Sequence, residues 1–157
     1  MLLKFDDDGP FATGMAPYRY VSVQGTDDTP RILVQIEVDN DLKEAILDTG
    51  GQYFFCTQKL AKEIAATERE ILARKVINLG GKSVDGSLCR IDLTLLSAEG
   101  DSLSMQVIAF LPDEDQEFPP NFLPLPYLGL FGCMEHVRFA IDPSRDVDQF
   151  YFGECSG

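Results

Sequence analysis

Apolar and polar residues alternate with a period of two over most of the chain, which is the pattern of half-buried β-strands. The alternation is clear in Tyr18–Gly25 and in Arg31–Asp39, and the turn-forming segment TDDTP between them predicts a hairpin. Further strands are predicted at Leu42–Asp48, Ala73–Leu79, Ser87–Ser97, Ser102–Leu111, in the segment YLGLFG, and in a final hairpin, VRFAID-PSRD-VDQFYFG. Turn-length connections favour antiparallel neighbours, so the pattern predicts a mostly β domain, a small barrel or sandwich.

Only two segments depart from this period towards a helix. In TQKLAKEIAA, Thr57 can cap the amino end, and apolar residues spaced by three and four share one face, which predicts a helix over Thr57–Ala66. The segment CMEH predicts at most one helical turn. Residues 112–126 are rich in proline and acidic residues and predict a long loop, whose phenylalanines and leucines should pack against the protein.

Composition sets limits on the class of protein. A chain of 157 residues with 45% apolar residues suits one packed domain, and we place it at residues 17–153 after an N-terminal extension, residues 1–16. A net charge of −13 argues against nucleic acid and anionic membranes as partners, because both require a basic face. The sequence has neither a membrane-spanning apolar run nor a convincing signal peptide, so a cytoplasmic location is expected.

The residues that bind metals or act as thiol nucleophiles are sparse. Four cysteines are far apart in the sequence and form no CxxC motif, and His136 is the single histidine. Cys133 and His136 lie on one short segment, which suits a surface turn better than a Cys-His catalytic pair. The acidic segments FDDDG and PDEDQE lack the register of a calcium loop, and GGKSVDG lacks the spacing of a phosphate-binding loop. We therefore expect no metal and no cofactor.

The segment EAILDTGGQYFFC carries the chemistry that stands out. Asp48 follows an apolar strand and begins a tight turn, where a carboxylate can activate water, and Gly50 leaves room for a substrate. Asp-Xaa-Gly is also ordinary turn chemistry, so the motif alone leaves both interpretations open. A single carboxylate is a poor amide hydrolase, whereas two that share one proton supply a general base and a general acid. Because Asp-Thr-Gly occurs once, such a pair requires two chains related by a twofold axis.

Three segments in this order, AILDTGGQYFFC, the hairpin GGKSVDG and YLGLFG…VRFAID, resemble the retropepsin-like family of aspartic proteases, the single-domain retroviral type. The resemblance extends over most of the chain, from Tyr18 to Phe152. It implies a small closed acid-protease-type β-barrel with one or two short helices. It also implies a homodimer that hydrolyses a peptide or protein substrate as an aspartic endopeptidase.

The resemblance also implies roles for individual residues. Asp48 is similar to the catalytic aspartate, Thr49 resembles the threonine that locks two catalytic loops across the dimer, and Gly50 resembles the turn glycine. Gly51 stands where the family more often has alanine or serine. The residues that resemble the tip of the substrate-covering flap are Leu79, Gly80, Gly81 and Lys82, and those that resemble the segment behind the catalytic loop are Leu128 and Gly129.

A second hypothesis belongs to another class of function. The same β-barrel could be catalytically inactive and serve as a peptide-binding, dimerisation or adaptor module, or as a scaffold domain in a larger assembly. Gly51 keeps this alternative open, because a second glycine loosens the loop that carries Asp48.

Overall fold

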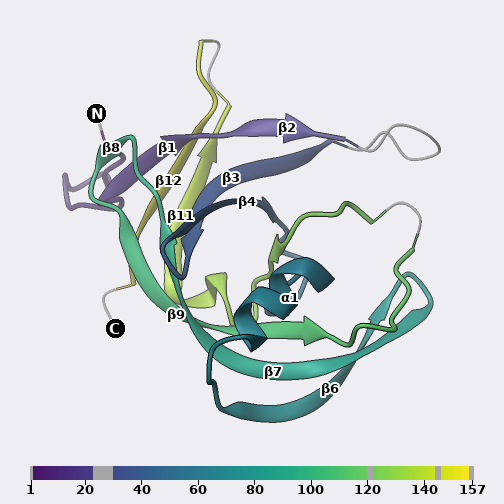
Figure 1. The fold of residues 1–157 in the computed structure, drawn as a ribbon. Coiled ribbons are helices and arrows are strands. Elements are labelled where there is room, and N and C mark those ends of the chain that lie inside the picture. Colours follow the sequence, from purple (N-terminus) through teal and green to yellow (C-terminus); the bar gives the residue numbers. More distant parts are fainter. Residues whose placement is uncertain (1, 23–29, 120–121, 144–145, 156–157) are drawn as a thin grey trace.

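The structure is a computed structural model, and it describes residues 2–22, 30–119, 122–143 and 146–155. The described residues are mostly β (Figure 1). The strands are β1 (Gly14–Pro17), β2 (Arg19–Val21), β3 (Arg31–Val38), β4 (Asp41–Leu47), β5 (Phe54–Phe55), β6 (Ile71–Leu79), β7 (Lys82–Leu95), β8 (Glu99–Gly100), β9 (Leu103–Pro112), β10 (Tyr127–Leu128), β11 (Val137–Asp142) and β12 (Gln149–Glu154). One α-helix, α1 (Gln58–Ala65), and one 3₁₀ turn, Met134–His136, complete the described elements.

Eight of these strands form a curled sheet with the order β2-β3-β4-β10-β5-β9-β7-β6. An additional antiparallel pairing of β3 with β7, from Ile36↔Leu95 to Val38↔Leu93, closes six of them into a ring. The closure is uneven, because β5 and β10 contribute two residues each whereas β7 and β9 run much longer. The predicted barrel is therefore present as a strongly curled, unevenly closed sheet.

The core follows the alternation of each strand. In β7 the buried residues Ile91, Leu93 and Leu95 face the largest cluster of buried side chains, whereas Val84 and Leu88 lie on the other face of the strand, against a second cluster. The largest group of buried side chains fills the inside of the ring, and the buried face of α1 packs against it. Thr57 caps α1 by accepting from the backbone N–H of Leu60 at 3.1 Å. The predicted helix and strand periodicity are therefore confirmed.

A second sheet has the order β11-β12-β1-β8. Strand β1 pairs with β12 from Gly14↔Phe152 to Pro17↔Gln149, so residues near both ends of the chain lie side by side (Figure 1). The domain boundary predicted between residues 16 and 17 thus falls inside a strand. The turn predicted at residues 26–30 lies almost entirely outside the described residues, as do residues 144 and 145 of the final hairpin turn.

Among the described strands, two pairs are parallel, whereas turn-length connections had favoured antiparallel neighbours. Strand β10 runs parallel to β4, with Tyr127 opposite Ile46, and β5 runs parallel to β9, with Phe54 opposite Ala109. Each of these pairs joins segments that are far apart in the sequence, so local turn chemistry carries no information about it. The antiparallel prediction is wrong for these pairs, and they surround the candidate site.

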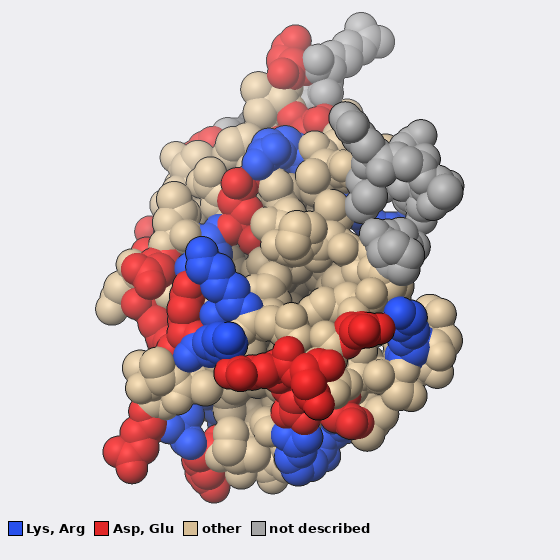
Figure 2. Space-filling model, turned by 45° about the vertical axis from the view of Figure 1, so that its right-hand side comes forward, with Lys and Arg blue, Asp and Glu red and all other residues tan. Residues whose placement is uncertain are grey.

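The predicted loop at residues 112–126 packs on the protein, as its apolar residues indicated. Phe118, Phe122, Leu123 and Leu125 lie against a second cluster of buried residues that includes Phe55, Phe110 and Tyr127. Figure 2 shows this side of the molecule, where Lys and Arg side chains lie beside Asp and Glu side chains rather than forming a basic patch. Across the described residues, no helix has the length and apolar composition needed to cross a membrane.

Candidate active site

Asp48 is positioned by the parallel pair of β4 and β10. It comes directly after β4, and its backbone N–H donates to the carbonyl of Leu128 at 2.9 Å. Its Oδ1 accepts from the N–H of Gly50 at 3.2 Å, and its carbonyl accepts from Gly51 at 3.1 Å. The side chain is half-buried, and no second described residue donates to its carboxylate. One oxygen therefore shapes the turn, and the other is open to a water molecule or a substrate.

The residues after Asp48 differ in what they touch. Thr49 is exposed and has no hydrogen bond within the part of the chain that the structure describes, so its expected role across a dimer stays a prediction. A Cβ atom added to Gly50 would lie 3.5 Å from Asp48 Oδ1, an ordinary contact. A Cβ added to Gly51 would lie 3.0 Å from Asp48 Oδ2. Glycine at position 51 therefore permits the observed orientation of the carboxylate, which alanine would displace by a few tenths of an ångström.

Leu128 and Gly129 lie directly behind this loop. Leu128 is buried, and the N–H of Gly129 donates to the carbonyl of Tyr53 at 2.8 Å. The N–H of the next residue, Leu130, donates to the carbonyl of Gly51 at 2.9 Å. A Cβ on Gly129 would lie 2.6 Å from both the Gln52 carbonyl carbon and the Tyr53 carbonyl oxygen, so only glycine fits here. The backbone at residues 128–130 thus fixes the course of the loop that carries Asp48.

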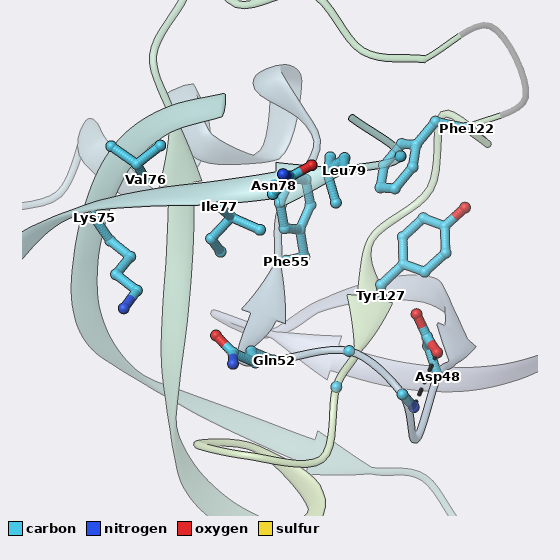
Figure 3. A pocket seen from close by; sticks show the side chains of 14 residues that line it. Asp48, Gln52, Phe55, Lys75, Val76, Ile77, Asn78, Leu79, Phe122 and Tyr127 are labelled. Carbon is cyan, nitrogen blue, oxygen red and sulfur yellow. Dashed lines mark hydrogen bonds between the residues drawn. The ribbon is translucent and has the colours of Figure 1, made fainter. Parts of the chain in front are cut away.

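A cavity of about 540 Å³ opens in front of Asp48 (Figure 3). Asp48, Gly50, Gly51 and Gly129 line one side, and residues 75–80 of β6 and its turn line the opposite side. Phe55, Phe122 and Tyr127 form an aromatic wall. The rings of Phe122 and Tyr127 are stacked, with a distance of 4.4 Å between their centroids. This volume is within the range of small-molecule or peptide side-chain pockets.

Sequence reasoning missed the aromatic wall and the polar residues Gln52 and Lys75 of this cavity. The resemblance placed the segment that begins at Tyr127 behind the Asp48 loop, but no local pattern indicated that the rings of Tyr127 and Phe122 would line the cavity, because their segments pair with residues distant in sequence. The Tyr127 hydroxyl accepts from the backbone N–H of Leu123 at 3.1 Å, which ties the proline-rich loop to β10. Burial raises the pKa of Tyr127, and the nearby Asp48 carboxylate adds to this effect, so the phenol stays neutral.

The β6–β7 hairpin places its tip at Gly80 and Gly81. Leu79 pairs with Lys82, and the two glycines have φ of 56° and 89°, which is the left-handed geometry of a two-residue hairpin turn. Asn78 Oδ1 accepts from the N–H of Gly81 at 2.9 Å. Gly86, in the predicted tip segment GGKSVDG, is instead buried within β7, where it pairs with Lys75. Strand β7 therefore starts five residues earlier than predicted, at Lys82 rather than Ser87.

A pair of substitutions tests the tip geometry. Gly80→Val is expected to destabilise the fold by about 1–2 kcal/mol, because a β-branched residue strains a positive φ. Gly80→Asn is expected to cost much less, because asparagine tolerates this region. No atom lies within 4 Å of a Cβ built at Gly80, so the difference reports backbone strain and not a clash. Urea unfolding measures both variants, and equal midpoints would contradict the assignment of the turn.

Lys82 lies outside the cavity, although it was predicted at the substrate-binding tip. Its Nζ lies 3.9 Å from Glu117 Oε2 in the proline-rich loop, so the side chain is directed towards that loop. The reason is its position after the turn, on the strand that runs beside the loop rather than on β6. Of the predicted tip residues, Leu79 and Gly80 line the cavity.

The proline-rich loop is fastened to the same hairpin by polar contacts. Arg74 Nη1 donates to Asp113 Oδ1 at 2.9 Å, and its Nη2 donates to Oδ2 of the same carboxylate. The N–H of Asp85 donates to Gln116 Oε1 at 2.8 Å. On the other side, Gln58 Nε2 lies within hydrogen-bond distance of the carbonyls of Asp113, Glu114 and Gln116. The loop therefore bridges the amino end of α1 and the hairpin over the cavity.

The ion pair between Arg74 and Asp113 should weaken in acid. The hydrogen bonds from Arg74 lower the pKa of Asp113 below its unfolded value of about 3.9. A carboxyl with a lowered folded pKa contributes stability above its unfolded pKa, and that contribution is lost as pH falls through the folded pKa. The Asp113 side chain is 35% exposed, so we expect only about 0.5 kcal/mol of destabilisation from Asp113→Asn at neutral pH.

Urea unfolding of Asp113→Asn and wild type at neutral pH, and again at about pH 3, should show the difference shrinking in acid. Asp115→Asn is the matched control, because Asp115 lies in the same loop and has no ion pair among the described residues. A difference that stays constant with pH would contradict a role for the charge of Asp113.

Cys133 and His136 do not form a catalytic pair. Cys133 is 2% exposed, and burial raises the pKa of its thiol to about 12, so it holds its proton near neutral pH. His136 is exposed, and its Nε2 lies 3.4 Å from Glu135 Oε1. Within the described ranges, no group of three or more His, Cys, Asp or Glu side chains is arranged to hold a metal ion.

Comparison with known proteins gives a distant likeness in fold. No protein-family model matches the sequence, and no curated protein matches it. Among solved structures, the chain is similar to a retropepsin-like aspartic protease from Rickettsia conorii, with a TM-score of 0.49 and 14% identity. The alignment covers 90% of this chain and 95% of that one. At this level of similarity the match concerns the backbone fold alone and assigns no function to any residue.

Proposed function

We propose that this protein is an aspartic endopeptidase in which the Asp48 carboxylates of two identical chains form one active site. The observation that carries the proposal is the placement of Asp48. Its carboxylate lies at a sterically open glycine turn in a 540 Å³ cavity, opposite a glycine-tipped hairpin. An extended peptide could lie between the loop and the hairpin, with its scissile carbonyl over the carboxylate.

The proposed mechanism divides the work between the two carboxyls. The ionised Asp48 removes a proton from a bound water as that water attacks the scissile carbonyl carbon, and the protonated Asp48 donates to the carbonyl oxygen. The carboxyl that took the proton from water then donates it to the leaving amine, while the other Asp48 takes a proton from a hydroxyl of the tetrahedral intermediate, so that one carboxyl is again ionised and one protonated. The β6–β7 hairpin would act as a flap that closes over the peptide and excludes bulk water.

An exposed apolar surface beside the loop supports the twofold dimer. Leu130 and Phe131 follow Gly129, and they are 39% and 55% exposed although both are large apolar residues. The N–H of Tyr53 donates to the carbonyl of Phe131, so this surface is continuous with the loop that carries Asp48. Two such surfaces meeting across a twofold axis would cover these side chains and bring the two loops together.

The second candidate is a barrel of the same fold that binds peptides or partner proteins without cutting them. The observation that favours it is the Gly50 N–H bond to Asp48 Oδ1, since a carboxylate that only closes its own turn would make the same contact. In that case the cavity would bind a peptide, and Asp48 would have a structural role.

Cleavage of a peptide library at about pH 5, where two carboxyls sharing a site can hold one proton, separates the two candidates. Wild-type protein should cut peptides, and Asp48→Asn should not, while the variant keeps its fold and its mass in solution. Binding without cleavage by both proteins would support the second candidate. Unchanged cleavage by the variant would contradict both candidates, because the protein would then cut peptides without the Asp48 carboxylate.

A further inference from the structure

One cation in the cavity, Lys75, has no partner among the residues that the structure describes. Lys75 lies in the middle of β6 and lines the same cavity as Asp48. Figure 3 shows its side chain on the same side of β6 as Ile77, directed towards Gln52, whereas Val76 points the opposite way. Because residues at even spacing share a face of a strand, Lys75 belongs to the inner face of the hairpin with Ile77 and Leu79. Those two residues pack on the second cluster of buried side chains.

Neighbouring cations on this side of the molecule are engaged by acids. Arg74 binds Asp113, Lys82 lies near Glu117, and Lys62 lies 3.8 Å from Glu114 Oε1. Lys75 forms no hydrogen bond or ion pair with any residue in the described ranges. Its ammonium group is therefore available to a ligand in the cavity.

The two ends of the cavity differ in chemistry. In Figure 3, Lys75 and Gln52 lie at one end, and Asp48 lies at the other end beside the stacked rings of Tyr127 and Phe122. An ammonium and a primary amide together offer donors to a carboxylate, and the amide oxygen of Gln52 adds one acceptor. The aromatic end offers apolar contact area next to the residue that would perform the reaction.

We propose that Lys75 makes the site selective for peptides with an acidic side chain, Asp or Glu, at a position removed from the scissile bond. This inference rests on the proposed peptidase function, because it assigns the substrate class of that same site. In a twofold dimer each chain supplies one Lys75, so the acidic positions are expected on both sides of the scissile bond. Gln52 would share the bound carboxylate.

Because the protein as a whole is acidic, a preference for acidic peptides would indicate a local cation in the site. A net charge of −13 repels acidic peptides at long range and favours basic ones. An enrichment of Asp and Glu at one defined position cannot arise from that field, so it must come from a local cation. The acid preference should also weaken with added salt, because the contact is partly exposed.

The test is the cleavage profile of a random peptide library with wild type, Lys75→Glu and Lys75→Met. Wild type should enrich Asp and Glu over Gln and Asn at a fixed position by roughly threefold to fivefold. Lys75→Met should remove this enrichment. Lys75→Glu should replace it with an enrichment of Lys and Arg. Lys82→Glu is the matched control, because it makes the same charge change at an exposed residue of the same hairpin outside the cavity, and its profile should resemble wild type.

The outcomes separate this inference from the proposed function. Cleavage with no acidic enrichment, or an enrichment that Lys75→Glu leaves unchanged, overturns the role of Lys75 and leaves the peptidase intact. If wild type cleaves no peptide, the peptidase proposal fails, and the role of Lys75 is then tested by measuring which peptides the protein binds. Library peptides retained by immobilised wild type should then be richer in Asp and Glu than those retained by Lys75→Glu, and equal retention overturns the inference.

Discussion

Mixing wild-type protein with an excess of Asp48→Asn is expected to suppress activity far more than dilution does. The substitution is nearly isosteric, and the amide oxygen of asparagine can keep the hydrogen bond from the Gly50 N–H, so the fold and the dimer should persist. A mixed dimer has one ionisable carboxyl and cannot supply both base and acid. With about a ninefold excess of the variant, only about one-tenth of wild-type chains pair with each other after random exchange.

Activity per total protein should therefore follow the square of the wild-type fraction. Subunit exchange is verified by native mass spectrometry of two chains that differ in mass, and turnover is measured on one peptide. The matched control is wild type mixed with an inert protein, in which activity stays proportional to wild-type chains. If proportionality also holds in the exchanged mixture with Asp48→Asn, each chain carries a complete site and the shared-carboxyl mechanism is wrong.

Gly129→Ala is expected to abolish most activity and to destabilise the protein. Its Cβ would lie 2.6 Å from backbone atoms of Gln52 and Tyr53, and backbone cannot rotate away as a side chain can. The loop that carries Asp48 must then move, or the hydrogen bonds of Gly129 and Leu130 to it must break. We expect a loss of about 2–3 kcal/mol of unfolding free energy, as for overpacking of a close-packed site.

Gly50→Ala provides the control for this substitution. It makes the same chemical change in the same site, but its Cβ would meet only Asp48 Oδ1 at 3.5 Å, so stability should change little. Urea unfolding and peptide turnover are measured on both variants. Equal stability of the two variants would mean that residues 128–130 do not hold the loop in place. Full activity of Gly129→Ala would mean that the position of Asp48 is not critical to the reaction.

The sequence was sufficient to predict the elements whose causes are local. Alternation in β3, β7 and β9, the Thr57 cap of α1 and the two-glycine turn at Gly80 and Gly81 each follow from residues within a few positions of one another. The turn that carries Asp48 is of the same kind, since Asp48 and Gly50 form it between themselves. These features needed no knowledge of the rest of the fold.

What surrounds Asp48 was decided only by the tertiary structure. The parallel pairing of β10 with β4 joins residues that are about eighty positions apart, and no turn connects them. That pairing brings Tyr127 and Gly129 to the loop, and packing of the proline-rich loop adds Phe122. The direction of Lys75 into the cavity, and of Lys82 away from it, depends on which face of the hairpin meets the core. The alternation of apolar and polar residues determined which side chains of each strand share a face. Which residues share the site with Asp48 was determined by long-range packing. The reason is that burial of apolar surface depends on contacts between segments from the whole chain, and no single segment contains that information.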